Sequence, residues 1–256
     1  MSMTLNHPIR DASVMSRRSI RHATRNLDSL LIGIVLPIML LVMFTYVFGG
    51  AIETGERYID FVVPSIIVLC AGYGAGTTAV SVTQDMTEGI VDRFRTMQVV
   101  SSAVLTGHVA ASMARNLGST AVVVLLSFAF GFRPTAGPLA WLAAIGLVAL
   151  FILALSWLSA TLGLLTRTVD AASSVGFFIL FLPYVSSAFV PIETMPGWLQ
   201  PVAAHQPITP IVETLRGLLL GTEIGSSAWV AVTWCVAILV VSVAAAALLW
   251  RRSRRP

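Results

Sequence analysis

The chain has 256 residues, of which 56% are hydrophobic and only 11% are charged. A soluble domain averages about 25% charged residues, so the composition excludes an ordinary soluble protein and predicts a single polytopic membrane domain over residues 1–256. The formal net charge is +4, and all sixteen basic residues are arginine. Because these arginines are dispersed at the edges of apolar stretches, we reject nucleic acid as a partner.

The N-terminal segment, residues 1–29, contains a predicted amphipathic helix at residues 14–28. Its apolar residues recur at helical spacing, while Arg18, Arg21 and Arg25 form a basic stripe on another face. This pattern is typical of a helix that lies in the membrane interface and contacts anionic headgroups. The alternative is a topology signal alone. No cleavage site is evident after the first apolar run, so we expect that run to stay in the membrane.

Six apolar runs contain no acidic or basic residue, and most reach the roughly 20 residues that a helix needs to cross a bilayer. They span residues 30–49, 61–84, 116–131, 139–166, 171–192 and 228–250. The run at 116–131 is short, but helix can continue backwards from it through residues 103–114. The sequence therefore predicts an all-α integral membrane protein with six transmembrane helices over residues 30–250, followed by a basic tail at 251–256.

The distribution of arginine predicts the orientation of these helices. Segments outside the predicted helices lie alternately on the two sides of the membrane. The N-terminal segment, the second loop, the fourth loop and the tail share one side and together hold thirteen arginines, with Arg115 assigned to the second loop. The other side holds only Arg57, Arg133 and Arg216. Because positive residues accumulate on the cytoplasmic side, both termini are predicted to face the cytoplasm.

The predicted cytoplasmic loop at residues 84–97 mixes charged and apolar residues. On a helix, Glu88 and Asp92 would be neighbours one turn apart, with Arg95 one turn further. An apolar stripe would lie beside them, formed by Ile90, Val91, Phe94 and Met97. Such a helix can lay its apolar face into a groove on a partner. A solvated loop with local ion pairs is the alternative, and composition does not decide between them.

The predicted outer connection at residues 191–227 is too apolar for a free loop and too broken to span the membrane. It contains an apolar helical stripe that Gly221 could end. We expect a re-entrant or interfacial helical hairpin between spans five and six, with Trp198 at the headgroup level. The alternative is an ordinary loop on the membrane surface.

Small residues inside the runs are expected to serve packing. The glycines of residues 72–76 are not followed by the Lys-Ser/Thr of a phosphate-binding loop, whereas Gly72 and Gly76 are spaced to let helices approach closely. Cys70 and Cys235 are expected to be small apolar packing residues. The chain carries no spaced Cys/His set, so no metal site is predicted.

Three stretches together resemble the membrane subunits of type-2 ABC exporters, specifically the daunorubicin-resistance permease group. They are residues 88–99, residues 186–200, and residues 206–210 followed by Leu215-Arg-Gly217 and Gly221. The similarity covers nearly the whole chain in the same order. Gln98 departs from the proline of many relatives, which affects only the local shape of the loop.

The resemblance implies a permease subunit in the bacterial cell membrane that exports an amphipathic or hydrophobic compound, such as an antibiotic or a lipid-like molecule. Such permeases pair with a second permease, identical or a sister subunit, and with a separate subunit that binds ATP and Mg. The coupling helix to that ATPase would contain Glu88, Gly89, Asp92, Arg93, Phe94 and Arg95. The helix with Arg18, Arg21 and Arg25 would be the connecting helix. The outer re-entrant segment would contain Met195, Pro196, Trp198, Pro207 and Arg216.

The residues themselves agree with this need for a partner. The chain has no G-x-x-x-x-G-K-[ST] motif for ATP and no carboxylate inside an apolar run, where ion-coupled transporters usually keep one. An uncharged pathway also suits a largely apolar substrate, because every buried charge must be matched. No catalytic residue, cofactor or metal is predicted in this chain.

Three alternatives stay open. A gradient-driven multidrug transporter would need Asp60 or Asp170 to be drawn into a span. An integral membrane enzyme would need a catalytic constellation, yet the histidines pair with no nucleophile or carboxylate at motif spacing. These are His7, His22, His108 and His205. The third alternative is a permease homologue with a regulatory role.

Overall fold

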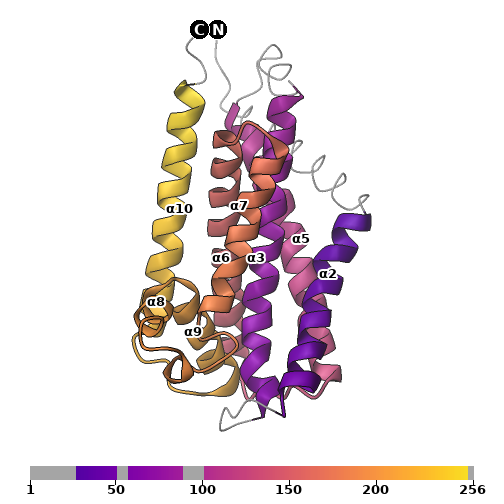
Figure 1. The fold of residues 1–256 in the computed structure, drawn as a ribbon, viewed down its shortest axis with the longest axis vertical. Coiled ribbons are helices and arrows are strands. Elements are labelled where there is room, and N and C mark those ends of the chain that lie inside the picture. Colours follow the sequence, from indigo (N-terminus) through magenta and orange to yellow (C-terminus); the bar gives the residue numbers. More distant parts are fainter. Residues whose placement is uncertain (1–26, 51–56, 89–100, 253–256) are drawn as a thin grey trace.

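The computed structural model describes residues 27–50, 57–88 and 101–252 (Figure 1). Within these ranges every regular element is helical. Six helices run side by side along the long axis of the molecule: α2 (Leu27–Val42), α3 (Tyr58–Thr87), α5 (Ser101–Ala129), α6 (Pro138–Leu165), α7 (Val169–Phe181) and α10 (Ser227–Arg252). A π-helical turn, η1 (Met43–Phe48), continues α2. The predicted all-α architecture is confirmed for the described part of the chain.

Four of the described helices are long and apolar enough to cross a membrane. They are Tyr58–Thr87, Val104–Ala129, Pro138–Leu165 and Ser227–Leu249. Two shorter apolar stretches, Val35–Phe48 and Val169–Val185, complete the set of six apolar elements. The protein is therefore a multi-pass membrane protein, while the count of six transmembrane helices stays a prediction.

Consecutive long helices run in opposite directions, so the connections alternate between two ends of the bundle (Figure 1). One end holds Thr87, Ser101 and the turn between α6 and α7. The opposite end holds the connection between α5 and α6 and all the residues between α7 and α10. The prediction of orientation assumed that successive connections lie on opposite sides of the membrane, and the described connections do alternate between the two ends of the bundle.

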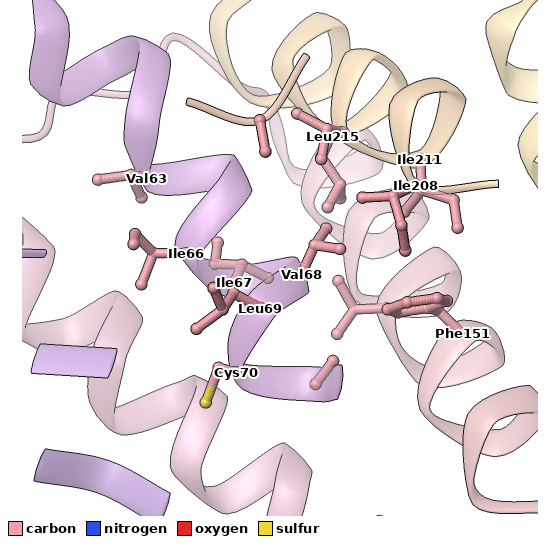
Figure 2. Packing of buried hydrophobic residues seen from close by; sticks show 14 of the residues in the cluster. Val63, Ile66, Ile67, Val68, Leu69, Cys70, Phe151, Ile208, Ile211 and Leu215 are labelled. Carbon is pink, nitrogen blue, oxygen red and sulfur yellow. The ribbon is translucent and has the colours of Figure 1, made fainter. Parts of the chain in front are cut away.

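Helix α3 forms the centre of the bundle and contacts α2, α5, α6, α7 and α9. Its most apolar stretch is 89% buried, whereas that of α10 is 17% buried. Figure 2 shows Val68 of α3 on the side that faces Phe151 of α6 and Ile211 of α9, and Ile66, Ile67 and Leu69 belong to the same buried cluster. Because one central helix contacts so many others, a displacement of α3 would be felt throughout the bundle.

Close helix approach depends on glycine at only some of the predicted positions. A Cβ atom on Gly76 would lie 3.1 Å from the Cα atom of Gly176, which confirms the packing role of Gly76 between α3 and α7. The same prediction is wrong for Gly72, which has open space around it. Cys70 and Cys235 are buried and free, as expected for packing residues.

The run at residues 171–192 was expected to form one transmembrane helix, and the structure divides it. Helix α7 ends at Phe181, the short 3-10 helix η2 covers Leu182–Val185, and the following residues leave the helix. Pro183 explains the break, because proline lacks the amide hydrogen and clashes with the preceding helical turn. The remainder of the run belongs to the segment that packs against the end of the bundle.

The assignment of Arg115 to a loop is wrong. As expected, helix continues backwards from residue 116, and α5 reaches Ser101. Arg115 therefore lies in the middle of a candidate span rather than beyond its end. Arginine is a good helix former, and the Arg115 side chain donates to acceptors on α3. The charge of Arg115 therefore does not mark the end of the membrane-spanning helix. Removing Arg115 from the thirteen leaves twelve arginines against three, and the asymmetry persists.

Candidate functional site

Residues 182–227 form a compact segment at one end of the bundle, which we call the outer cap (Figure 1). It contains η2, η3 (Ile192–Thr194), α8 (Gln200–His205) and α9 (Ile208–Leu220). Helix α9 contacts α3, α6 and α10, and it buries the apolar face formed by Ile208, Ile211, Val212, Leu215 and Leu219. Gly221 ends α9 with a φ of 77°, as predicted. A free surface loop would not bury such a face.

Arg216 joins the outer cap to the first turns of α3. Its Nε atom donates to the carbonyl of Phe61 at 3.1 Å, and its guanidinium carbon lies 3.6 Å from the centre of the Phe61 ring. Its Nη2 atom donates to the carbonyls of Ser187 at 2.8 Å and Ala188 at 3.1 Å, and to the Ser65 hydroxyl at 3.2 Å. Arg216 therefore supplies hydrogen-bond donors to backbone carbonyls of a non-helical stretch, where no regular backbone hydrogen bonding satisfies them.

Other side chains complete the attachment of residues 185–189 to their surroundings. The Tyr58 hydroxyl donates to the carbonyl of Phe189 at 3.0 Å. Ser65 donates to the carbonyl of Ala188, and Gln206 donates to that of Val185. Tyr58 and Ser65 were not predicted as part of this attachment, because a hydroxyl group in or beside an apolar run does not indicate which distant carbonyl it will contact.

The other residues predicted for the outer segment lie around its exposed side. Trp198 is 76% exposed, and Pro196 beside it is also exposed. Met195 and Pro207 are half-buried, and Pro207 immediately precedes α9. An exposed tryptophan on an apolar cap suits the headgroup region of a membrane. Insertion of this segment into a bilayer stays a prediction.

The opposite end of the bundle carries the start of the predicted coupling segment. Glu88 caps α3 with an exposed side chain, and its backbone N–H donates to the carbonyl of Gln84 at 2.9 Å. The rest of the predicted segment lies outside the described residues: Gly89, Asp92, Arg93, Phe94 and Arg95. The predicted interfacial residues Arg18, Arg21 and Arg25 also lie outside them.

One turn before Glu88, a histidine and a carboxylate meet between α3 and α5. His108 Nε2 lies 2.9 Å from Asp85 Oδ2. The two residues are 23 positions apart, so this pair does not stand at a motif spacing and was not predicted; the fold brings the two segments together. His205 is exposed and its Nδ1 atom lies 2.8 Å from the carbonyl of Pro201.

The two acidic residues that a gradient-driven transporter would need inside a span are found at helix starts. Asp170 is exposed in the first turn of α7. Asp60 is buried in the first turn of α3, where Arg57 contacts its carboxylate at 2.6 Å. Among the described residues, no group of three or more His, Cys, Asp or Glu side chains is placed to hold a metal.

Polar side chains also meet halfway along the bundle. Arg115 Nη2 donates to the Thr77 hydroxyl at 2.8 Å and to the carbonyl of Gly74 at 3.4 Å. The next residue, Asn116, donates to the Ser112 hydroxyl at 3.2 Å, which lies 2.8 Å from that of Ser156. The expected uncharged interior is therefore corrected: one cationic side chain from α5 reaches across to α3.

Comparison with known proteins decides what kind of membrane protein this bundle is. Residues 10–220 match the model of the family described as ABC-2 type transporter. The chain belongs to the ABC-2 type transporter family. It is therefore a membrane permease of the ABC type, a transport component rather than an enzyme, and the family implies an ABC ATP-binding partner.

Relatives of this permease carry names from drug resistance. It is 33% identical over 191 residues to the daunorubicin resistance ABC transporter permease protein DrrB1 of Streptomyces coeruleorubidus, which covers 74% of this chain and 68% of the relative. It is 25% identical over 242 residues to the probable doxorubicin resistance ABC transporter permease protein DrrC of Mycobacterium tuberculosis strain H37Rv, covering 94% of this chain and 88% of the relative. The suspected relationship to daunorubicin-resistance permeases is confirmed.

Proposed function

We propose that the protein is the permease subunit of an exporter that moves an amphipathic or hydrophobic compound out of the cell. The energy comes from ATP hydrolysis, with Mg, on a separate subunit. The family match over residues 10–220 carries the proposal. The names of the relatives favour export of a drug-like or antibiotic compound.

The segment after α3 couples the permease to its ATPase. Glu88 marks where α3 ends, and the following residues Gly89, Asp92, Arg93, Phe94 and Arg95 form the coupling helix. The position of α3 at the centre of the bundle supports this assignment, because movement of its end would be passed to several neighbouring helices. Such a helix offers both an apolar stripe and charges to a groove on the ATPase.

The chain forms one transmembrane domain with six spans and both termini in the cytoplasm of a bacterial cell. The continuous helix Leu27–Phe48 is about 33 Å long, and Val169–Val185 about 25 Å, at 1.5 Å per residue. These lengths suit a hydrocarbon core of about 30 Å. Arg18, Arg21 and Arg25 lie at the cytoplasmic interface, and the outer cap enters the outer leaflet and closes the exit of the pathway.

A second permease, either an identical copy or a sister subunit, completes the transporter. Apolar side chains on the outward faces of α7 and α10 support such an assembly, including Phe177, Phe178 and Trp229, which are 59%, 73% and 79% exposed. These faces otherwise contact lipid.

The first test is affinity purification of the tagged permease from native membranes, with ATPase activity measured in the eluate. We expect an ATP-binding subunit to co-purify, and Glu88→Arg and Arg93→Glu to release it, because each reverses a charge of the coupling segment. Arg167→Glu is the matched control, since Arg167 is exposed in the other connection at this end of the bundle.

Two results would contradict the proposal. One is a permease that purifies and transports without any ATPase. The other is transport that ceases when the proton gradient is collapsed while ATP remains, and that Asp85→Asn abolishes. The second result would favour the gradient-driven alternative and give the pair of Asp85 and His108 a role in proton movement.

A further inference from the structure

Arg115 lies deep within the bundle rather than near the end of a span. Its acceptors Gly74 and Thr77 precede Glu88, the end of α3, by eleven to fourteen residues. At 1.5 Å per residue this places the guanidinium roughly 15 to 20 Å from that end, close to the middle of a hydrocarbon core about 30 Å thick. The contacts also show that the side chain turns across to α3 and does not extend along α5 towards the headgroups.

The protein satisfies only part of this guanidinium. An arginine side chain offers five N–H donors and always carries its charge, but the acceptors found for Arg115 among the described residues are one hydroxyl and one carbonyl, both at Nη2. Its Nε atom is buried without a hydrogen-bond partner. Among the carboxylates whose side chains the structure describes, none lies within ion-pair distance of Arg115. A cation at this depth normally has a partner or a function.

The α3 surface beside Arg115 is polar and partly open. Tyr73, Thr77 and Ser81 recur one helical turn apart, so they share one face of α3. All three are half-buried, whereas most of their neighbours from Val62 to Thr83 are fully buried. The Ser81 hydroxyl donates to the carbonyl of Thr77 at 3.0 Å. Arg115, which donates to Thr77 of this face at 2.8 Å, is itself half-buried.

We propose that Arg115, held by Thr77, binds a carboxylate or phosphate group of an amphiphile within the bilayer, beside the polar face of α3. The remaining N–H groups of a guanidinium fit two oxygens of such an anion, and the apolar surroundings accommodate its hydrocarbon part. This inference rests on the proposed function and narrows its substrate class, because a cationic amphiphile would be repelled at this position.

The test measures binding to the complex of the permease and its ATP-binding subunit, purified in dodecyl maltoside. The probes share one fluorophore and one chain: dansylaminoundecanoic acid, its methyl ester, and the corresponding trimethylammonium compound. We expect the acid to bind about tenfold more tightly than the ester, and the cation to bind most weakly, because only the acid forms a charge-assisted hydrogen bond.

Variants identify the group responsible. Arg115→Gln is expected to weaken the acid about tenfold and to change ester binding less than about twofold. Arg115→Lys keeps the charge but loses the two-pronged geometry, so it should weaken the acid by a smaller factor, and Thr77→Val should do the same by releasing the guanidinium. Arg167→Gln, at an exposed arginine, is the control and should change neither probe. Unchanged ester binding shows in each case that the variant is folded.

The inference is overturned if the acid and the ester bind the wild-type complex equally, or if Arg115→Gln weakens both to the same extent. Charge pairing within the chain gives a further check: if Asp28→Asn, in the first turn of α2, reproduces the loss seen in Arg115→Gln, then Arg115 serves as an internal ion-pair partner and the inference also fails. Loss of the ATP-binding subunit from the wild-type complex would instead contradict the proposed function, so the two failures are distinguishable.

The source of the anion is resolved with nanodiscs. If phosphatidylglycerol displaces the acid and diacylglycerol, which has no phosphate, does not, the bound anion is a bilayer lipid. If neither lipid displaces it, the anion belongs to a free amphiphile. Both results support the site, whereas displacement by diacylglycerol to the same extent as by phosphatidylglycerol would show that the anionic group is not recognised.

Discussion

Arg216 and Arg115 carry the same charge but have different surroundings. Arg216 donates to the backbone carbonyls of three residues and lies over the ring of Phe61, so much of its hydrogen-bonding capacity is used within the protein. Arg115 donates to one carbonyl and one hydroxyl and has a buried Nε atom without a partner among the described residues. The first arrangement is that of a residue that holds structure together, and the second is that of a residue prepared for a ligand.

Replacing Arg216 by alanine should loosen the outer cap. The change removes charge-assisted hydrogen bonds and leaves the carbonyl of Ser187 without this donor, so we expect the free energy of unfolding to fall by about 2–3 kcal/mol. Thermal unfolding in detergent measures it. Arg133→Ala is the control, because the exposed Arg133 side chain at the same end bonds, among the described residues, to the nearby carbonyls of Phe128 and Phe132. The alanine variant keeps the backbone N–H that donates to Asp60, so it should change stability by less than about 0.5 kcal/mol. Equal effects would show that Arg216 is not an anchor.

Helix α6 is held against the centre of the bundle by a glycine contact. A Cβ atom on Gly163 would lie 2.6 Å from the carbonyl oxygen of Ala79 on α3. The Thr83 hydroxyl reinforces the same contact by donating to the carbonyl of Gly163 at 2.9 Å. Since the obstructing atom is backbone, it cannot rotate away, and the distance between α3 and α6 is set by the absence of a side chain.

Gly163→Ala should therefore destabilise the bundle although alanine favours helix. We expect a loss of about 1–3 kcal/mol from overpacking, measured as the midpoint of thermal unfolding in detergent. Gly146→Ala, on the same helix, is the matched control because nothing lies within 4 Å of its added Cβ atom. It should be neutral or stabilising by up to about 1 kcal/mol. If the two variants behave alike, the contact between α3 and α6 does not depend on Gly163.

Apolar runs predicted which segments are helical but not where each helix ends. The charge-free run at 116–131 ended at Arg115, yet α5 continues to Ser101 because the guanidinium finds acceptors on another helix. That backward continuation of the helix was expected, whereas the prediction was wrong after Phe181, where a long run leaves the helix at Pro183 and enters the outer cap. The position of Arg115 inside a helix depends on contacts with a distant segment, which a run of residues does not reveal, whereas the end of α7 follows from the local effect of Pro183.

The candidate sites were predictable to different degrees for the same reason. Proline, tryptophan and glycine predicted a broken helical segment before the last long helix, and the structure has one there, because turn and helix-end signals are local. Its re-entrant position stays a prediction. Its attachment through Ser65 and Tyr58 was not predictable, since their acceptors lie more than a hundred residues away. The pair of His108 and Asp85 was missed because the two residues belong to different helices.

Orientation in the membrane concerns the molecule as a whole, and it follows from the alternating helices and the arginine asymmetry. With Arg115 assigned to a span, twelve arginines lie on the side predicted to be cytoplasmic and three on the other. Positive residues are retained in the cytoplasm, so Arg167 should be inside the cell and the outer cap should be outside. Glu193 is an exposed residue of the outer cap and Arg167 lies at the opposite end of the bundle, so the two positions test the prediction directly.

A membrane-impermeant maleimide should label Glu193→Cys in spheroplasts and label Arg167→Cys only after the membrane is permeabilised. Both native cysteines are buried, so the wild-type protein should remain unlabelled and serves as the control. Labelling of Arg167→Cys before permeabilisation, with protection of Glu193→Cys, would mean that the protein has the opposite orientation. Helix α7 connects the turn after α6, which contains Arg167, to the outer cap. If α7 crosses the membrane, the two positions lie on opposite sides, so labelling of both from one side would show that α7 does not cross.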